Sequence, residues 1–339
     1  MRAMRVALWL LITLTWLGGL AGQAWAAPAD ATPPDPPVIL GISTPGLLCG
    51  VASQPDDWPG VEVMGLAEPG SRLQLWLQGP CDAAPSPIAW LWADDAGRWR
   101  QEIAPLEPGC YRFQVGSCDA ADNWSWGGDL EVELVPGEMR EVVVLQQGAV
   151  DDDPHDGLTY WDAEVADTSL CAWAPQRNYG DSTRLCVRYG AEINSLLRFD
   201  LGALPPGVRI ERATLALYCT GRSNPHPLEV QAYRVQSDWL DAEATCNQAS
   251  ASATWELPGA NGQADRDLTP SAAALIDRDR VWRTFDITPL VGAWYAAPSE
   301  NHGVLLKGAP DISVQYDFAS SEYPDARLRP MLWLALVAE

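Results

Sequence analysis

Apolar and polar residues alternate with a period of two along most of the first half of the chain. This period is that of β-strands, whose successive side chains point to opposite faces of a sheet. Turn-forming segments such as Glu68-Pro69-Gly70 separate the runs. The expected strands are Val38–Ser43, Val61–Leu66, Arg72–Leu77, Ile88–Ala93, Arg98–Ile103, Tyr111–Val115 and Leu130–Leu134. Short strands at this density, with no helical period, predict a small β-sandwich for residues 38–147.

The second half shows the same period, and we expect nine strands there. They are Ala163–Trp173, Thr183–Tyr189, Ser195–Asp200, Arg209–Cys219, Leu228–Val235, Val281–Ile287, Gly303–Lys307, Ser313–Ala319 and Met331–Val337. Only Leu290–Ala297 and Ser271–Asp277 suggest short helical turns. The pattern favours a larger jelly-roll sandwich for residues 159–339, so the fold class is all-β: one β-sandwich followed by a second, larger one.

Residues 1–26 have the composition of a secretory signal peptide. Two arginines precede an apolar run from Val6 to Leu20, and Ala24-Trp25-Ala26 supplies small residues at the expected cleavage site. Where a lipoprotein signal would need a cysteine, the chain has Gln23. We therefore expect a secreted, extracellular protein without a lipid anchor and with no membrane insertion.

Two further segments are expected to lie outside the sandwiches. Residues 27–37 are proline-rich and predict an extended spacer. Residues 148–158 are acidic, contain Pro and Gly, and are expected to form a solvated linker. The aspartates at 151, 153 and 156 have a spacing similar to that of calcium loops, but no Glu follows at the distance such loops require.

Charge narrows the classes of partner. The formal net charge of −23 repels phosphate backbones and anionic lipids, so nucleic acid is not an expected partner. Three histidines leave little room for a zinc cluster or a histidine-based triad. No nucleophile elbow or nucleotide loop is present, and among 45 acidic residues a pair of carboxylates carries no information about glycoside hydrolysis. The sequence therefore favours a protein that is not an enzyme and has no cofactor.

Motifs in the first half resemble those of bacterial immunoglobulin-like (Ig-like) repeats. They are Gly65-Leu66-Ala67-Glu68-Pro69-Gly70-Ser71, Ala96-Gly97-Arg98-Trp99 and Asp119-Ala120-Ala121-Asp122-Asn123-Trp124-Ser125. Asp122 stands where the repeats usually have glycine. The resemblance implies a spacer or interaction module over residues 38–147, without an active site.

The second half contains a longer ordered series of motifs. It includes Asn178-Tyr179-Gly180, Leu196-Leu197-Arg198-Phe199-Asp200-Leu201, Ala213-Thr214-Leu215-Ala216-Leu217-Tyr218, Phe285-Asp286-Ile287-Thr288 and Ser320-Ser321-Glu322. This region resembles the disaggregatase-related DNRLRE domain, also classed as carbohydrate-binding module family 96. The resemblance implies polysaccharide binding, and most motif positions are those expected of a sandwich core. Related sandwiches often carry a structural calcium ion, for which Asp167 is the candidate ligand.

All eight cysteines follow the expected cleavage site, four in each half, which is typical of a disulfide-stabilised exported protein. Where the family has Trp after Thr245 this chain has Cys246, so a bond from Cys246 to Cys219 could replace the indole. The other expected pairs are Cys171 with Cys186, Cys81 with Cys110 and, by elimination, Cys49 with Cys118.

The densest set of sugar-binding side-chain types lies near the start of the second region. Aromatic faces stack on sugar C–H surfaces, while arginine and amide groups bind hydroxyls or carboxylates. The candidate residues are Trp173, Arg177, Tyr179, Arg184 and Arg188, with Gln176 beside them. Alternation places Arg184 and Arg188 on one face of their strand. The alternative interpretation is local: the arginines pair with nearby carboxylates, Tyr179 caps a turn and Trp173 covers an edge.

Other tryptophans form two weaker candidate sets. Trp239, Trp255 and Trp282 lie in or beside expected loops, with Trp239 at a family core position. Trp90 and Trp92 share a face in the first sandwich, near Trp76 and Trp99 in sequence, and we expect them in its core and not on a sugar platform.

The sequence thus predicts a secreted, non-catalytic protein that binds an extracellular or cell-wall polysaccharide through residues 159–339. Two alternatives stay open. One is a structural or adhesive surface protein that contacts cell-wall or matrix proteins, and the less favoured one is a polysaccharide lyase or hydrolase.

Overall fold

The computed structural model describes residues 31–44, 60–80, 84–149, 159–309 and 313–338. Almost all regular structure in these ranges is β, which confirms the predicted all-β sandwich fold. The single α-helix described, α1 (Thr288–Ala296), corresponds to the helical turn expected at Leu290–Ala297. Three short 3₁₀ turns complete the helical content described: η1 (Tyr189–Ala191), η2 (Pro298–Glu300) and η3 (Ala326–Leu328).

The N-terminal strands form two sheets that face each other. The first has the order β1-β2-β5, and the second has the order β4-β3-β6-β7 with β8 also paired to β6. Their bounds are β1 Val38–Ser43, β2 Val61–Leu66, β3 Arg72–Gln78, β4 Ser86–Trp92, β5 Arg98–Ile103, β6 Gly109–Cys118, β7 Trp124–Trp126 and β8 Leu130–Leu134. The core between the sheets includes Val63, Leu73, Leu75 and Phe113.

The C-terminal strands form two further layers. One contains β10, β9, β22, β14 and β19, and the other contains β14, β21, β12, β13, β11, β20, β15 and β18. Their bounds are β9 Arg140–Gln146, β10 Thr159–Asp162, β11 Val165–Cys171, β12 Arg184–Arg188, β13 Ile193–Phe199, β14 Val208–Arg222, β15 Leu228–Arg234, β16 Gln248–Ser250, β17 Ala253–Thr254, β18 Ala272–Ile276, β19 Trp282–Asp286, β20 Val304–Gly308, β21 Gln315–Ala319 and β22 Met331–Ala338. Strands β16 and β17 pair only with each other.

The strand β14 belongs to both C-terminal layers. Its first part pairs with β22 and β19, and its last part, from Cys219 to Arg222, pairs with β21. A register shift between Cys219 and Gly221 marks the place where the strand passes from one layer to the other. The main core of the molecule lies between these layers and includes Leu215, Leu217, Phe285 and Phe318.

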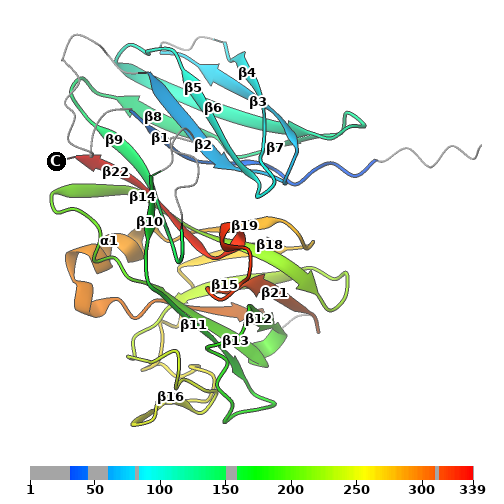
Figure 1. Cartoon of the computed structure of the whole chain (residues 1–339), viewed down its shortest axis with the longest axis vertical. Coiled ribbons are helices and arrows are strands. Elements are labelled where there is room, and N and C mark those ends of the chain that lie inside the picture. Colours follow the sequence, from blue (N-terminus) through cyan, green and yellow to red (C-terminus); the bar gives the residue numbers. More distant parts are fainter. Residues whose placement is uncertain (1–30, 45–59, 81–83, 150–158, 310–312, 339) are drawn as a thin grey trace, which may run out of the picture.

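The four layers form one stack, with a third core between the N-terminal and C-terminal sandwiches (Figure 1). Leu40, Met64 and Leu66 of β1 and β2 pack there against residues of the next layer, including Trp282 and Trp333. Both inner sheets are therefore covered on both faces. This explains why β9 and β22 are continuous apolar runs and not alternating ones.

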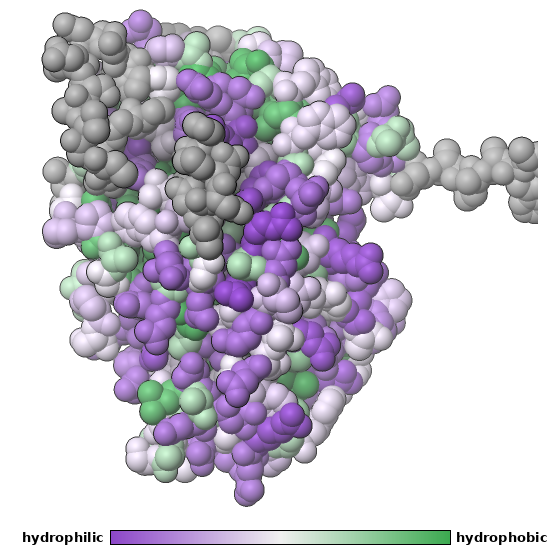
Figure 2. Space-filling view, viewed as in Figure 1, coloured by the Kyte–Doolittle hydropathy of each residue, from purple (hydrophilic) through white to green (hydrophobic). Residues whose placement is uncertain are grey.

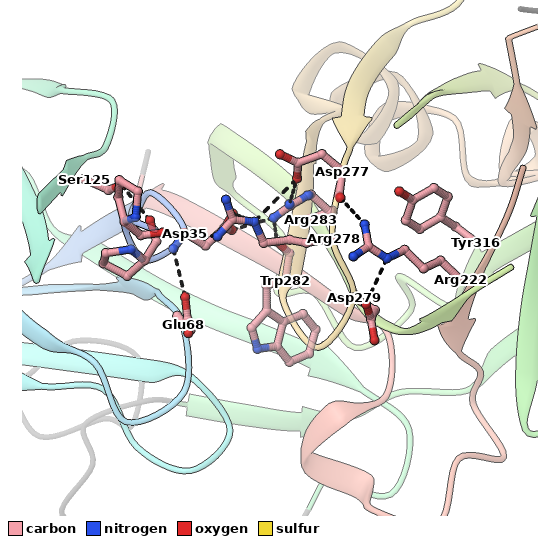
Figure 3. A network of polar contacts seen from close by, with 12 residues as sticks. Asp35, Glu68, Ser125, Arg222, Asp277, Arg278, Asp279, Trp282, Arg283 and Tyr316 are labelled. Carbon is pink, nitrogen blue, oxygen red and sulfur yellow. Dashed lines mark hydrogen bonds and ion pairs between the residues drawn. The ribbon is translucent and has the colours of Figure 1, made fainter. Parts of the chain in front are cut away.

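The segment before β1 was expected to be a spacer, and its described part contacts both sandwiches (Figure 3). The hydroxyl of Ser125 donates to the Pro34 carbonyl over 2.6 Å, and that of Ser117 donates to the Asp35 carbonyl over 3.1 Å. The Asp35 carboxylate pairs with Arg283 of β19. The segment thus links the outer N-terminal sheet to the C-terminal sandwich.

Several details differ from the expectations. The segment Ser271–Asp277 contains the strand β18 and not a helical turn, because its backbone pairs antiparallel with β15 at the edge of the sheet. No strand was expected at Arg140–Gln146, which lies within the residues assigned to the N-terminal sandwich. These residues form β9, which hydrogen-bonds to β22 of the C-terminal sandwich. Asp122 adopts φ +62°, so it keeps the left-handed backbone of the glycine it replaces, a conformation that Asp tolerates.

Hydrophilic residues dominate the face shown in Figure 2, and hydrophobic residues appear there in small separate groups. No helix of the described residues is long and apolar enough to cross a membrane. The expected signal peptide (1–26) and the aspartates at 151, 153 and 156 lie outside the described residues.

Candidate functional site

The candidate sugar-binding residues lie on β12 and on the loop that precedes it. Leu185 and Val187 of β12 are buried in the main core, whereas Arg184, Cys186 and Arg188 point to the opposite side. The predicted common face of the two arginines is therefore confirmed. The neighbouring strand β21 pairs antiparallel with β12 and presents Gln315 and Asp317 opposite Arg188 and Cys186.

Trp173 and Arg188 form one half of this surface. The Trp173 side chain is 61% exposed, and the Arg188 guanidinium lies 4.9 Å from the centroid of its ring. Arg188 also donates to Glu192 over 2.6 Å and to the Ser313 hydroxyl over 2.9 Å. These contacts fix the guanidinium against one face of an indole that is otherwise open to solvent.

Arg177 and Tyr179 form the other half. The Arg177 guanidinium lies 4.9 Å from the centroid of the Tyr179 ring. None of the described carboxylates lies within ion-pair distance of Arg177, which is exposed. Burial raises the pKa of the Tyr179 phenol, and the neighbouring Cys171 thiol adds to the effect. The phenol is thus a neutral hydroxyl, which can both donate and accept a hydrogen bond.

Arg184 lies at the start of β12 and is tied to a carboxylate. Its guanidinium donates to Asp317 over 2.9 Å, and Asp317 also accepts from Gln315 over 2.6 Å. Burial and the charge of Asp317 raise the pKa of the Cys186 thiol to about 12, so this thiol is protonated and inert. Arg184 and Arg188 therefore have the carboxylate partners that the local interpretation expected, while Arg177 has none among the described residues.

The loop is held in place by its Asn-Tyr-Gly motif. The Asn178 amide donates to the carbonyls of Asp241 and Ala244 over 2.6 and 2.8 Å, and its oxygen accepts from the Gly180 amide. A Cβ at Gly180 would lie 2.7 Å from the Asp241 carbonyl oxygen. The motif thus joins the loop to a segment more than sixty residues later, and holds the backbone on both sides of Tyr179.

The second set of tryptophans is buried and cannot stack on a ligand. The exposed fractions of Trp239, Trp255 and Trp282 are 1%, 5% and 5%. Their indole nitrogens donate to the carbonyls of His302, Thr245 and Ala96 respectively. In the N-terminal sandwich Trp99 is buried as expected, but Trp90 and Trp92 are 53% and 66% exposed, so their expected place in the core is wrong. Alternation shows that two side chains share a face, but not that another layer covers it.

Asp167 lies in β11 and is 2% exposed. Its Oδ2 accepts from the Ser321 amide over 2.7 Å, whereas Oδ1 has no partner among the described residues, and neither has Oε2 of Glu322. Burial and the charges of Glu322 and Asp241 raise the pKa of Asp167 well above its ordinary value. Two such oxygens suit calcium in type, but calcium takes roughly six to eight oxygens. No group of three His, Cys, Asp or Glu side chains suited to a metal occurs among the described residues. The raised pKa favours a protonated Asp167, and the two oxygens can alternatively hold a cation completed by other oxygens.

The described cysteines are free thiols. They are Cys110, Cys118, Cys171, Cys186, Cys219 and Cys246. The bonds expected between Cys219 and Cys246 and between Cys171 and Cys186 are therefore not formed in this structure. Cys219 instead contacts the Gly221 carbonyl, and burial raises its pKa to about 12. Cys49 and Cys81, the expected partners of Cys118 and Cys110, lie outside the described residues.

The structure thus defines a β-sandwich module in which β12 and the loop before it carry an exposed indole, a phenol and guanidinium groups. The sequence identified these side chains but not their partners Asp317, Glu192 and Ser313. Asp317 and Ser313 lie 133 and 125 residues from the arginines that they contact, while Glu192 follows Arg188 by four residues. The family model of carbohydrate-binding module family 96 matches residues 162–335. The chain belongs to this family, and the match supports carbohydrate binding.

Two further comparisons add little. One solved structure comes from work on the promiscuous specificity of carbohydrate-binding modules from the β-sandwich superfamily. Its alignment with this chain covers 92% of this chain and 98% of that chain. Its sequence identity is 10% and its TM-score 0.18, which is too low to support an argument. No curated protein matches this chain.

Proposed function

We propose that the chain is an exported, non-catalytic protein that binds an extracellular or cell-wall polysaccharide through its C-terminal module. Trp173, Arg177 and Tyr179 make the contact. The family match supports carbohydrate binding, and the 61% exposure of Trp173, whose ring is braced by Arg188 on one side, is the observation that carries the choice of surface. Because Arg188 holds one face of the indole, the other face can stack on a sugar ring with little loss of side-chain entropy.

The pairing of the arginines bears on the kind of glycan. A uronic acid polymer needs free positive charge, but Arg184 and Arg188 are already paired with Asp317 and Glu192. The chain as a whole is strongly acidic. We therefore expect a neutral polysaccharide, with Arg177 and the Tyr179 hydroxyl hydrogen-bonding to sugar hydroxyls.

The division of labour along the chain is part of the same proposal. Residues 1–26 direct export, and strands β1 to β8 within residues 38–147 form an Ig-like module. Residues 159–339 form the binding module, which β9 (Arg140–Gln146) joins through β22, and residues 27–37 and 148–158 are connecting segments. The third core, built from both sandwiches, supports a fixed arrangement of the two modules and not a loosely tethered one.

Affinity electrophoresis of the full chain in gels containing neutral or anionic polysaccharides tests this function. Trp173→Ala and Arg177→Ala should each weaken retardation by a neutral polysaccharide about tenfold. Leu268→Ala, which truncates a side chain that is 64% exposed outside this surface, should leave it unchanged. Unaltered retardation of both variants on every polysaccharide that retards the wild type would count against the site, and release of new reducing ends would count against the non-catalytic role.

A further inference from the structure

The outer sheet of the N-terminal sandwich carries an aromatic surface that takes no part in the binding proposed for the C-terminal module. Strands β3, β4 and β7 present five tryptophans on the side opposite Leu73 and Leu75, which are buried in the core. They are Trp76, Trp90, Trp92, Trp124 and Trp126. Trp90, Trp92 and Trp126 are 53%, 66% and 51% exposed. Neighbouring exposed indoles on one face mark a binding surface and not a core.

The rings form a continuous row. Trp90 contacts Trp124 edge-to-face with centroids 5.7 Å apart, and Trp124 stacks on Trp126 at 5.7 Å with an interplanar angle of 14°. Trp126 contacts Trp76 edge-to-face at 6.1 Å. These spacings lie in the favourable range for aromatic pairs and are close to the length of one hexose unit. Trp124 and Trp126 have nearly parallel ring planes, and Trp90 and Trp76 stand at 61° and 65° to them, so the row offers both ring faces and ring edges to the sugars of a chain.

Neighbouring residues hold the row rigid. The Arg72 guanidinium lies 4.6 Å from the centroid of the Trp90 ring, and the Trp76 indole nitrogen donates to the Gln74 side chain over 3.1 Å. Trp126 lies directly over Gly116 of β6, where an added Cβ would approach its ring to 3.0 Å. The absence of a side chain at Gly116 lets the indole lie flat across the sheet. The ring is therefore already ordered, and ligand binding costs little further conformational entropy.

Polar groups lie among and beside the rings. Gln74 and Gln114 project from the same face, and Gln114 donates to Asp129 over 2.7 Å. At the Trp92 end the row borders a cleft of about 490 Å³, whose lining includes Arg72, Asp119 and Asp122. Flat aromatic faces interspersed with amide, guanidinium and carboxylate groups match the alternating C–H faces and hydroxyls of a glycan.

Carboxylates outnumber guanidinium groups among the charged residues of this face. Arg72 pairs with Asp122 at 3.6 Å, and Arg112 pairs with Asp129 and lies 3.8 Å from Glu131. No excess positive charge is present to hold an anionic sugar or an anionic lipid headgroup. A rigid, flat sheet face is also poorly shaped for insertion into a bilayer, where protruding apolar loops or helices are needed. The observations thus favour a neutral glycan chain over a membrane.

We infer that the face formed by Trp76, Trp90, Trp92, Trp124 and Trp126 is a second carbohydrate-binding surface, which binds a neutral polysaccharide chain independently of the Trp173 surface. In Figure 1 the sheet β4-β3-β6-β7 lies at one end of the molecule, and β12 lies in the opposite half. Two separated sites on one rigid stack can bind two chains, or two stretches of one chain, and raise the overall avidity without new contacts.

The experiment uses the full chain with the C-terminal surface disabled by Trp173→Ala and Arg177→Ala. This background variant is run in affinity gels containing hydroxyethylcellulose, mixed-linkage β-glucan, xylan, galactomannan, starch, alginate or polygalacturonate. We expect it to remain retarded by at least one neutral polysaccharide, and Trp90→Ala with Trp126→Ala to weaken that retardation at least tenfold. Failure of the background variant to bind any polymer, or a loss below tenfold, overturns the inference.

A second pair of variants separates loss of ring faces from loss of fold. Trp90→Phe with Trp126→Phe keeps an aromatic face at each position and should weaken binding less than threefold. Circular dichroism establishes that each variant is folded. If the alanine variants abolish self-association or binding to phosphatidylcholine–phosphatidylglycerol vesicles while polysaccharide binding is intact, the surface serves a second copy or a membrane, and the inference is wrong. The outcome at Trp173 is read separately in a chain that carries Trp90→Ala and Trp126→Ala, so either site can fail alone.

Discussion

Arg283 of β19 pairs with Asp35, which precedes it by 248 residues and lies before the first strand. The same guanidinium donates to Asp277 over 2.7 Å and to the carbonyl of Trp282 over 3.0 Å. Arg278 lies 3.8 Å from both carboxylates. Figure 3 shows this network beside Trp282. Trp282 and Met64 belong to the third core, so the network lies at the junction of the two sandwiches.

Removal of the central guanidinium should destabilise the whole stack. Arg283 and Asp35 have side chains only 10% and 13% exposed, so Arg283→Leu leaves a largely buried carboxylate with the more distant Arg278. We expect a loss of about 3 kcal/mol in the free energy of unfolding, measured by urea denaturation. The control is Arg327→Ala, which breaks the more exposed pair with Asp325 and should cost less than about 0.5 kcal/mol. Equal losses in both variants would contradict the assigned role of the junction.

Two glycines in turns of the N-terminal sandwich make a matched pair. Gly70 and Gly97 both have left-handed backbones, with φ of +72° and +83°. A Cβ at Gly70 meets no atom within 4 Å, whereas at Gly97 it would lie 2.4 Å from the Ala67 carbonyl oxygen and 3.1 Å from the Trp282 ring. Gly70→Ala should therefore cost about 1 kcal/mol from the backbone alone, and Gly97→Ala about 3 kcal/mol.

Thermal unfolding of the two glycine variants provides the measurement. The extra cost at Gly97 arises where the N-terminal turn meets β19, so Gly97→Ala should also loosen the contact between the sandwiches. Limited proteolysis should then cleave this variant faster than Gly70→Ala. Indistinguishable melting temperatures for the two variants would show that the turn does not press against Trp282 as described.

The buried carboxylate of Asp167 should make stability depend on pH. Its pKa is raised in the folded state, so the folded chain binds the proton more tightly than the unfolded chain does. This contribution is present below the ordinary pKa of aspartate and is lost as pH rises through the raised value. Asp167→Asn keeps the acceptor for Ser321 and supplies a donor toward Glu322, so in EDTA it should exceed the wild type by about 1–3 kcal/mol at pH 8 and by less at pH 4.

Addition of calcium distinguishes a protonated Asp167 from a calcium ion held by Asp167 and Glu322. If Asp167 and Glu322 hold the ion, millimolar calcium should raise the melting temperature of the wild type at pH 8 but not that of Asp167→Asn. A calcium effect of equal size in both proteins would exclude Asp167 as a ligand. In EDTA, a variant less stable than the wild type at pH 8 would show that the ionised carboxylate stabilises the fold.

Most strands could be predicted from the sequence because alternation is a local property. The nine strands expected in the second half are all present, from β11 to β22, and β12 presents Arg184 and Arg188 on one face as expected. Strand β9 escaped prediction because its apolar run does not alternate, whereas the similar run of β22 follows the family motif Arg329-Pro330-Met331-Leu332. Strand β18 was mistaken for a helical turn because its alanine-rich sequence carries little β signal.

The candidate site was predicted in part for the same reason. The loop that holds Trp173, Arg177 and Tyr179 could be recognised from its residue types and from the family motif beside it. The pairing of Arg184 with Asp317, 133 residues later, depends on β12 lying beside β21, and no local pattern encodes that neighbour. Whether an arginine is free to meet a ligand is therefore decided by sheet order.

The sequence by itself determined the β-strands, the family and the two faces of each strand, since these follow from the order of residue types along short stretches. Only the tertiary structure decided which of those faces another layer covers. Trp239, Trp255 and Trp282, candidates for ligand contact, are buried, while Trp90 and Trp92, expected in the core, are exposed on an outer sheet. The physical reason is that burial depends on the packing of layers distant in sequence. An indole can pack in an apolar core or stack on a sugar ring, so its residue type alone does not decide between them.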